Sequence, residues 1–288
     1  MVSASACEGA GGLDGRSVYG SVRTGDRSGF SPDGSRIAFA WNGDPGPGVQ
    51  GFDLYVKALG SETLLRLTRH PSEWISPVWS PDGTQIAFHR MDGADTGIYV
   101  VSALGGPERK LRSTRMPWNV FSPLKNLTLI SWSPDGKWIA FADVAPEEEH
   151  TKISLLSTET MESKHIPIGP MCVSEGLPAF SHDGRYLAYW CFRNEYQAGL
   201  YSLPLPVGKP RMIAPIRGFP VGLTWLADDA QLIYSLWNGS SNQLGEFTIA
   251  NGSTKQLAFA GNDMQLAVSP TLSELAISGV SVTSAEYL

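Results

Sequence analysis

The stretch WSPDGKWIAF occupies residues 132–141, and closely similar stretches are FSPDGSRIAF (30–39), WSPDGTQIAF (79–88) and FSHDGRYLAY (180–189). Two weaker copies follow, WLADDAQLIY (225–234) and VSPTLSELAI (268–277). Successive copies begin 43 to 53 residues apart. A period in the forties is the size of one four-stranded propeller blade, so the repeat favours a β-propeller over a β-sandwich with similar turns.

The S-P-D-G core of the repeat has the composition of a tight hairpin turn. Proline fixes φ near the value that the turn needs, aspartate bonds the local backbone, and glycine accepts a positive φ. The strand that follows alternates, with Ile37 and Phe39 facing one way and Ala38 and Ala40 the other. We expect the aromatic residue before each turn to fill the space between blades. These aromatics are Phe30, Trp79, Trp132, Phe180 and Trp225.

Each repeat carries two further strand signals, such as DLYV (53–56) and LLRLT (64–68) in the first. Together they predict an all-β, six-bladed propeller of four-stranded antiparallel blades over residues 27–288, with repeats starting near 30, 79, 132, 180, 225 and 268. The sixth repeat lacks its outer strand. We predict that a segment around Ser17–Arg23, within an N-terminal segment 1–26, supplies that strand and closes the ring. The alternative is a disordered, glycine-rich tail.

Composition excludes several classes of protein. The 288 residues are 42% hydrophobic and 17% charged, with 31 Gly and 20 Pro, which is typical of a turn-rich β protein. The net charge of −6 provides no large basic footprint, so we expect no nucleic-acid binding. No stretch approaches the 18 to 20 apolar residues that a membrane span requires. We expect a monomer.

The three cysteines are too few for a disulfide framework. Cys172 and Cys191 lie in one repeat, where they either pair or remain buried thiols, and the sequence favours the thiols. The start MVSASACEGAGG has no cationic region or apolar core of a signal peptide. We therefore expect a cytoplasmic protein if the chain is complete, and a periplasmic one if a signal or anchor lies upstream.

The W/F-S-P-D-G repeat followed by a (D/G)-(I/L)-Y strand resembles the TolB-like, WD-repeat-like β-propeller family over residues 27 to 288. The match is specific in the first four repeats. It is weak in the fifth, which lacks the turn glycine at Asp229, and in the sixth, which lacks both Asp and Gly over Thr271–Leu272. The resemblance implies a bacterial module that binds a protein or senses a ligand, as in multidomain regulators and cell-envelope complexes.

The sequence gives little support for catalysis. It contains no G-x-S-x-G pentapeptide of a serine hydrolase, no C-x-x-C, and no pair of His residues at metal-ligand spacing. We therefore predict no metal, no cofactor and no catalytic residue. The prediction is a non-catalytic scaffold with a protein or peptide partner. The alternative is an enzyme with its site in the central channel, such as a polysaccharide lyase or a glycoside hydrolase.

A partner is expected to bind at the mouth of the channel, on the segments that lead into the innermost strands. These segments do not repeat, and loops carried by a rigid scaffold are where binding residues concentrate. An aromatic there either binds the partner or caps its blade. The candidate binding residues are Glu73, Trp74, Trp118, Asn119, Glu175, Phe219 and Asp263.

Overall fold

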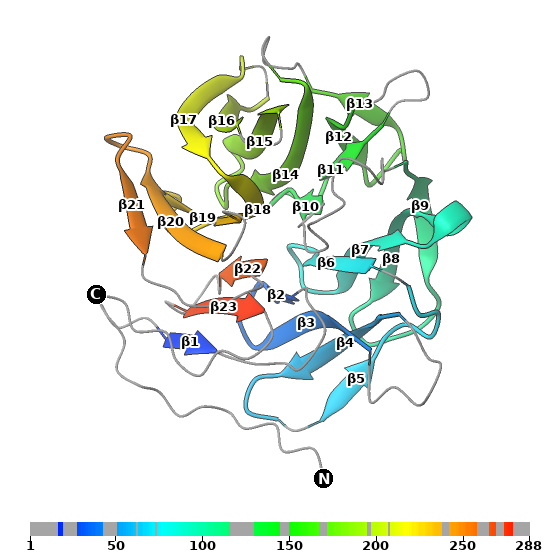
Figure 1. Cartoon of the computed structure of the whole chain (residues 1–288). Coiled ribbons are helices and arrows are strands. Elements are labelled where there is room, and N and C mark those ends of the chain that lie inside the picture. The colour runs from blue at the N-terminus through cyan, green and yellow to red at the C-terminus, as the bar shows by residue number, and fades with distance from the viewer. Residues whose placement is uncertain are drawn as a thin grey trace.

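Five four-stranded antiparallel sheets are arranged around a common centre (Figure 1). The computed structural model describes residues 17–19, 28–42, 51–61, 63–72, 74–115, 130–144, 150–166, 172–194, 197–206, 208–237, 242–257, 265–268 and 274–278. Apart from one short 3₁₀ helix, η2 (Gly93–Asp95), every named element in these ranges is a strand. No helix in these ranges is long and apolar enough to cross a membrane.

Each blade is built from four consecutive strands, ordered from the centre outward. Blade 1 consists of β2 (Ser28–Phe30), β3 (Arg36–Trp41), β4 (Asp53–Ala58) and β5 (Leu64–Arg66), and blade 2 of β6 (Trp74–Trp79), β7 (Gln85–Met91), β8 (Gly97–Ser102) and β9 (Arg109–Ser113). Blade 3 consists of β10 (Ile130–Trp132), β11 (Trp138–Asp143), β12 (Lys152–Ser157) and β13 (Ser163–His165). Blade 4 consists of β14 (Ser174–Phe180), β15 (Tyr186–Asn194), β16 (Gln197–Pro204) and β17 (Arg211–Arg217), and blade 5 of β18 (Phe219–Trp225), β19 (Gln231–Trp237), β20 (Asn242–Thr248) and β21 (Thr254–Leu257).

The propeller with four-stranded antiparallel blades is confirmed, but the number of blades is not. The structure shows five blades, where the repeat count predicts six. The sixth repeat forms only β22 (Gln265–Val268) and β23 (Glu274–Ser278) of a three-stranded sheet. The physical reason lies in its sequence, since this repeat has lost the aspartate and the glycine of the turn, and residues 279–288 lie outside the described residues.

The third strand of that sheet comes from the N-terminal segment. β1 (Ser17–Tyr19) pairs in parallel with β23, with Ser17 opposite Glu274 and Tyr19 opposite Ala276. The innermost strands β2, β6, β10, β14, β18 and β22 contact one another in turn, and β22 contacts β2. That the segment around Ser17–Arg23 closes the ring as a fourth, outer strand stays a prediction.

The S-P-D-G turns are held by a short network that repeats from blade to blade. The Ser31 hydroxyl donates to Asp33 Oδ1 (2.5 Å) and accepts the backbone N–H of Arg36 (2.9 Å), while the Ser35 N–H donates to Asp33 Oδ1. The Ser31 hydroxyl, together with the donors of Ser35, lowers the pKa of Asp33 to about 2. The same bonds recur in the turns that contain Asp82, Asp135 and Asp183. The aspartate of the motif therefore serves the turn.

Two of the aromatic residues before the turns, Trp79 and Trp225, join neighbouring blades. The buried Trp79 indole donates to the carbonyl of Gly29 in blade 1 (2.8 Å). The buried Trp225 indole donates in the same way to the carbonyl of Ala179 in blade 4 (2.9 Å). Trp132 differs, because its indole donates to Gly136 of its own turn. Each indole fills space between blades and satisfies its own donor, which a buried polar group requires.

Candidate functional site

The two faces of the ring carry different segments of the chain. We call the face that carries the S-P-D-G turns the turn face, and the face where the innermost strands begin the top face. Of the seven candidate residues, Glu175 and Phe219 are fully described, and both lie at the start of an innermost strand on the top face. Trp74 begins β6, and only its backbone is described. Glu73, Trp118, Asn119 and Asp263 lie outside the described residues.

Glu175 is fully buried at the seam between blades 3 and 4. Its Oε2 accepts the N–H of Ile153 (3.2 Å), its own N–H donates to the carbonyl of Thr151, and its carbonyl accepts the Thr151 hydroxyl. Burial, followed by the charge of Glu175, raises the pKa of Tyr189, whose side chain is also fully buried. A partner on the top face does not touch Glu175 in this arrangement, so the carboxylate acts as a support between two blades.

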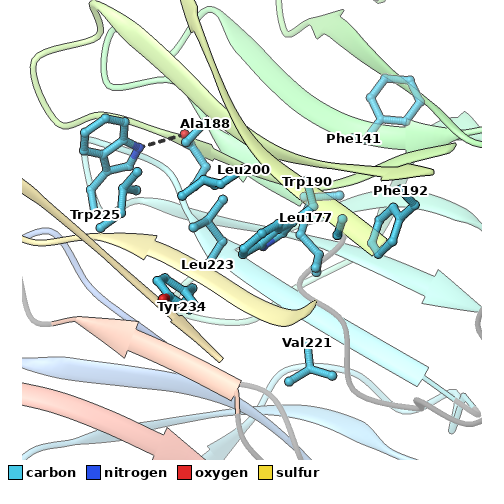
Figure 2. Packing of buried hydrophobic residues seen from close by; sticks show 14 of the residues in the cluster. Phe141, Leu177, Ala188, Trp190, Phe192, Leu200, Val221, Leu223, Trp225 and Tyr234 are labelled. Carbon is cyan, nitrogen blue, oxygen red and sulfur yellow. Dashed lines mark hydrogen bonds between the residues drawn. The ribbon is translucent and has the colours of Figure 1, made fainter. Parts of the chain in front are cut away.

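Phe219 lies at the seam between blades 4 and 5, where aromatic side chains gather. Its ring is half-buried, with its centroid 5.5 Å from that of Phe192 in β15, and it pairs across the ladder with Trp237. Trp190 is fully buried and meets Tyr234 of blade 5 edge-on, with 5.8 Å between centroids. Figure 2 shows Trp190 and Phe192 beside Leu177, with Val221 of blade 5 nearby.

Both innermost strands at this seam are irregular. In β14 the register shifts between Gly176 and Ala179, and Leu177 has a φ of 55°, a left-handed conformation that is rare for a branched side chain. In β18 the register shifts between Pro220 and Gly222. The described ladders of the other innermost strands show no such shift. β-bulges are over-represented beside active sites because they re-aim side chains.

Blade 4 contains buried polar atoms that have no hydrogen-bond partner among the described residues, among them Trp190 Nε1, Ser174 Oγ and the Tyr189 hydroxyl. Neither Trp190 nor Ser174 is among the candidate residues predicted from the sequence, although the repeat contains a signal for Trp190. The residue after I-A-F or its equivalent is Ala40, His89, Ala142 and Ser235 in the other repeats, and only blade 4 has an aromatic there.

A disulfide bond joins Cys172, just before β14, to Cys191 in β15, with Cα atoms 5.2 Å apart. The preferred interpretation of two buried thiols is therefore wrong. The sequence could not decide because the pairing depends on the antiparallel register, which places Cys191 opposite Glu175, three residues from Cys172. The bond fixes the segment that leads into β14 against the second strand of blade 4.

One serine–histidine pair has the distance of a catalytic pair but not its exposure. Ser154 Oγ and His165 Nδ1 lie 2.8 Å apart across β12 and β13. Ser154 is only 1% exposed and its strand pairs with β11 and β13 without a register shift, so no irregular stretch gives a peptide carbonyl a path to its hydroxyl. Within the described ranges, no group of three or more His, Cys, Asp or Glu side chains is arranged to hold a metal ion.

Comparison with known proteins adds information that the geometry lacks. No protein-family model matches the chain. The chain is 26% identical over 250 residues to dipeptidyl-peptidase 5 of Porphyromonas gingivalis. This matched region covers 81% of this chain and 34% of that protein. It is 25% identical over 198 residues to the uncharacterized peptidase YuxL of Bacillus subtilis, covering 56% and 28%. The chain thus spans about a third of the length of the curated relatives that it matches.

Solved structures support a TolB-like propeller. TolB of Acinetobacter baumannii superposes with a TM-score of 0.65 at 19% identity, covering 83% of this chain and 56% of that one. A TolB candidate from Agrobacterium tumefaciens gives a TM-score of 0.69 at 15% identity, covering 90% and 91%. At such identities the likeness shows the fold alone. The WD-repeat part of the resemblance has no support from these two structures.

The prediction of a non-catalytic scaffold, and with it the expectation that the protein is no enzyme, is contradicted by the relatives. Both curated relatives are named peptidases. The reason for the error is physical: the repeat encodes blades and turns, and the same blades serve enzymes and binding proteins alike. The absence of G-x-S-x-G excludes one nucleophile motif from these 288 residues. It does not show whether the propeller is part of an enzyme.

Proposed function

We propose that this chain is the β-propeller of an enzyme that acts on peptides, and that peptides bind at the seam between blades 4 and 5 on the top face. The similarity to two named peptidases carries this proposal, because the longer match covers 81% of the chain. Because the match extends over most of the propeller, it supports the same role for the propeller in this chain as in that peptidase. The irregular β14 and β18 give the proposal a location.

The role assigned to the propeller is binding of the substrate. Ser154 is buried within β12, so peptide bond cleavage is not assigned to the Ser154–His165 pair. The top-face seam instead offers the half-buried ring of Phe219 and the 43% exposed Val173, and Phe192 contacts both, packing against Phe219 and accepting the Val173 N–H through its carbonyl. Apolar and aromatic surface with a few polar groups is the usual lining of a site for a small ligand.

A calorimetric titration of the purified chain tests this function. The ligands are acetylated, amidated hexapeptides with phenylalanine or leucine at the third position, and oligogalacturonates of similar length serve as the comparison. The comparison is chosen because an oligogalacturonate lyase shares the fold, with a TM-score of 0.59 at 14% identity over 90% of this chain and 71% of that one. We expect the peptides to bind with dissociation constants of about 0.1 to 1 mM, and the uronates not to bind.

Mass spectrometry of the same mixtures shows whether the peptides are cleaved. Binding with cleavage, or binding without it, supports the propeller as the peptide-holding part of an enzyme. Binding of the oligogalacturonates in place of the peptides would overturn the proposal, and so would a lack of heat exchange with every hexapeptide at millimolar concentration.

A further inference from the structure

Two buried tryptophans at the same blade seam differ in one respect. Trp225 and Trp190 both belong to one buried cluster, which extends from blade 2 to blade 5. The Trp225 indole donates to Ala179 O, a bond drawn in Figure 2, whereas Trp190 Nε1 has no partner among the described residues. Buried donors in folded proteins are almost always paired, so an unpaired indole N–H indicates a partner other than the described residues.

A second donor without a partner belongs to the same strand pair. Ser174 is 3% exposed, its Oγ has no hydrogen-bond partner among the described residues, and it pairs with Phe192 in the ladder. Gly176 pairs with Trp190 two positions further along. Because alternate residues of a strand share a face, Ser174 and Gly176 lie on one face of β14, opposite Phe192 and Trp190.

The backbone beside these donors is the least regular of the described innermost strands. Leu177 and Pro178 stand opposite Tyr189 alone, so this stretch of β14 is outside the regular ladder. Val221 is likewise the extra residue of the bulge in β18. Leu177 and Val221 belong to the same buried cluster as Trp190. Two neighbouring strands are therefore interrupted at one level of the seam, and strained residues such as Leu177 cluster at ligand sites.

The chemistry of the two donors selects the class of ligand. An indole N–H and a serine hydroxyl are both uncharged, and the side chains around Trp190 are apolar and aromatic. A charged carboxylate placed there loses its hydration without gaining a cation, whereas an amide carbonyl needs only a neutral donor. The site fits a peptide backbone flanked by an apolar side chain better than it fits a uronate.

We propose that the seam between blades 4 and 5 binds a peptide by donating from Trp190 Nε1 and Ser174 Oγ to backbone carbonyl oxygens, while an apolar side chain of the peptide packs against Phe192 and Phe219. This assignment rests on the proposed function and specifies which side chains contact the peptide. Trp190 is fully buried and Ser174 is only 3% exposed, so the peptide enters by moving the bulged residues of β14 and β18 apart, which are the residues that the strand ladders do not hold.

The test compares Trp190→Phe with Trp225→Phe. Both variants lose the same ring volume, but only Trp225→Phe also loses an internal hydrogen bond. We expect Trp225→Phe to have the lower melting temperature without peptide. We expect Trp190→Phe to bind the phenylalanine hexapeptide about tenfold more weakly, the loss typical of one hydrogen bond, and Trp225→Phe to bind it as the unmodified chain does.

A readout on the unmodified chain needs no variant. The ¹⁵N-labelled indole resonances are followed while the hexapeptide is added, and we expect the Trp190 proton to move downfield while that of Trp225 stays in place. Peptide binding with an unmoved Trp190 resonance and an unchanged affinity in Trp190→Phe would overturn this assignment and leave the proposed function standing. Failure of every peptide to bind would instead overturn the proposed function.

Discussion

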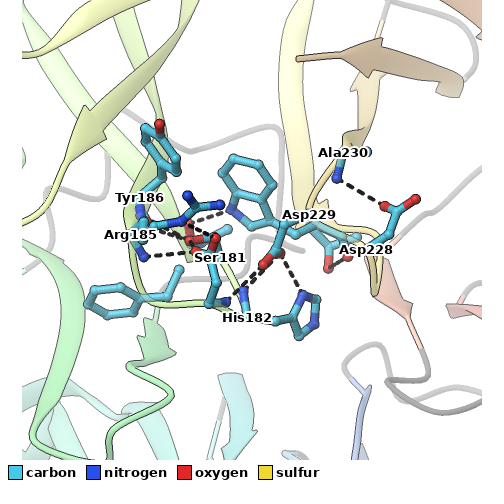
Figure 3. A network of polar contacts seen from close by, with 12 residues as sticks. Ser181, His182, Arg185, Tyr186, Asp228, Asp229 and Ala230 are labelled. Carbon is cyan, nitrogen blue, oxygen red and sulfur yellow. Dashed lines mark hydrogen bonds and ion pairs between the residues drawn. The ribbon is translucent and has the colours of Figure 1, made fainter. Parts of the chain in front are cut away.

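Substitution of Asp229 by alanine is expected to destabilise the propeller by about 3 kcal/mol, or roughly 6 to 12 °C in melting temperature. The Asp229 carboxylate accepts three hydrogen bonds from blade 4: from the His182 N–H (2.8 Å), His182 Nδ1 (2.9 Å) and the Asp183 N–H (2.8 Å) (Figure 3). Alanine removes all three. It also leaves a β-carbon at a φ of 55° without the local bonding that lets aspartate tolerate this conformation.

The contact exists because two turns depart from the repeat in complementary ways. Residue 182 is histidine where four other repeats have proline, so it has a backbone N–H to donate. Residue 229 is aspartate where the repeat has glycine, so it has a carboxylate to accept. The fifth turn lacks the serine-hydroxyl bonds of the others, because Leu226 replaces the serine, but it keeps the backbone bond from Asp229 N–H to Leu226 O and the Asp228 cap on Ala230. Its loss of glycine therefore adds an inter-blade bond while the backbone bond of the turn remains.

A double-mutant cycle in urea measures this coupling. His182→Pro and Asp229→Gly each restore the repeat, and the double variant is expected to lose at least 1 kcal/mol less than the sum of the single losses. Asp228→Ala is the matched control, because it removes one cap within the same turn and no bond between blades. Strict additivity of the two substitutions would show that the turns are not coupled.

Removal of the Cys172–Cys191 bond is expected to cost about 3 kcal/mol, because the bond closes a loop of 19 residues that the unfolded chain otherwise leaves open. The measurement compares urea midpoints of the unmodified chain and a Cys172→Ser, Cys191→Ser variant, with and without reductant. Reductant should lower only the midpoint of the unmodified chain.

Cys7→Ser is the matched control for the disulfide and should behave as the unmodified chain. Recovery of three free thiols from the native protein in non-reducing mass spectrometry would contradict the bond.

The fold could be predicted from the sequence because its information is local and repeated. The residues of the S-P-D-G turn make their bonds within five positions, as Ser31, Asp33 and Arg36 show. The alternation of large and small apolar residues in the strand after the turn can likewise be read from neighbouring positions. The blade count failed where the repeat eroded, because the sixth repeat forms β22 and β23 and obtains a third strand from β1, a pairing between residues at opposite ends of the chain.

The site could be predicted only in part, for a related reason. Phe219 was identifiable as an aromatic outside the alternating pattern, and the structure places it beside Phe192. The bulges in β14 and β18 depend on partners in neighbouring strands, and no short motif encodes them. Trp190 was visible as an exception to the repeat, but its unpartnered N–H follows from packing between two blades. Glu175 was expected at the channel mouth, and its burial between blades 3 and 4 likewise depends on Thr151 and Ile153 of another blade.

The central claim is that peptides are held where blades 4 and 5 meet on the top face. Amide hydrogen exchange of the unmodified chain, followed by mass spectrometry with and without the phenylalanine hexapeptide, tests it most directly. The account predicts slower exchange in 174–179 and 219–223 on peptide addition, and unchanged exchange in the turns at 31–35 and 80–84. Protection confined to the turn face, or no protection at a peptide concentration that saturates the calorimetric signal, would contradict it.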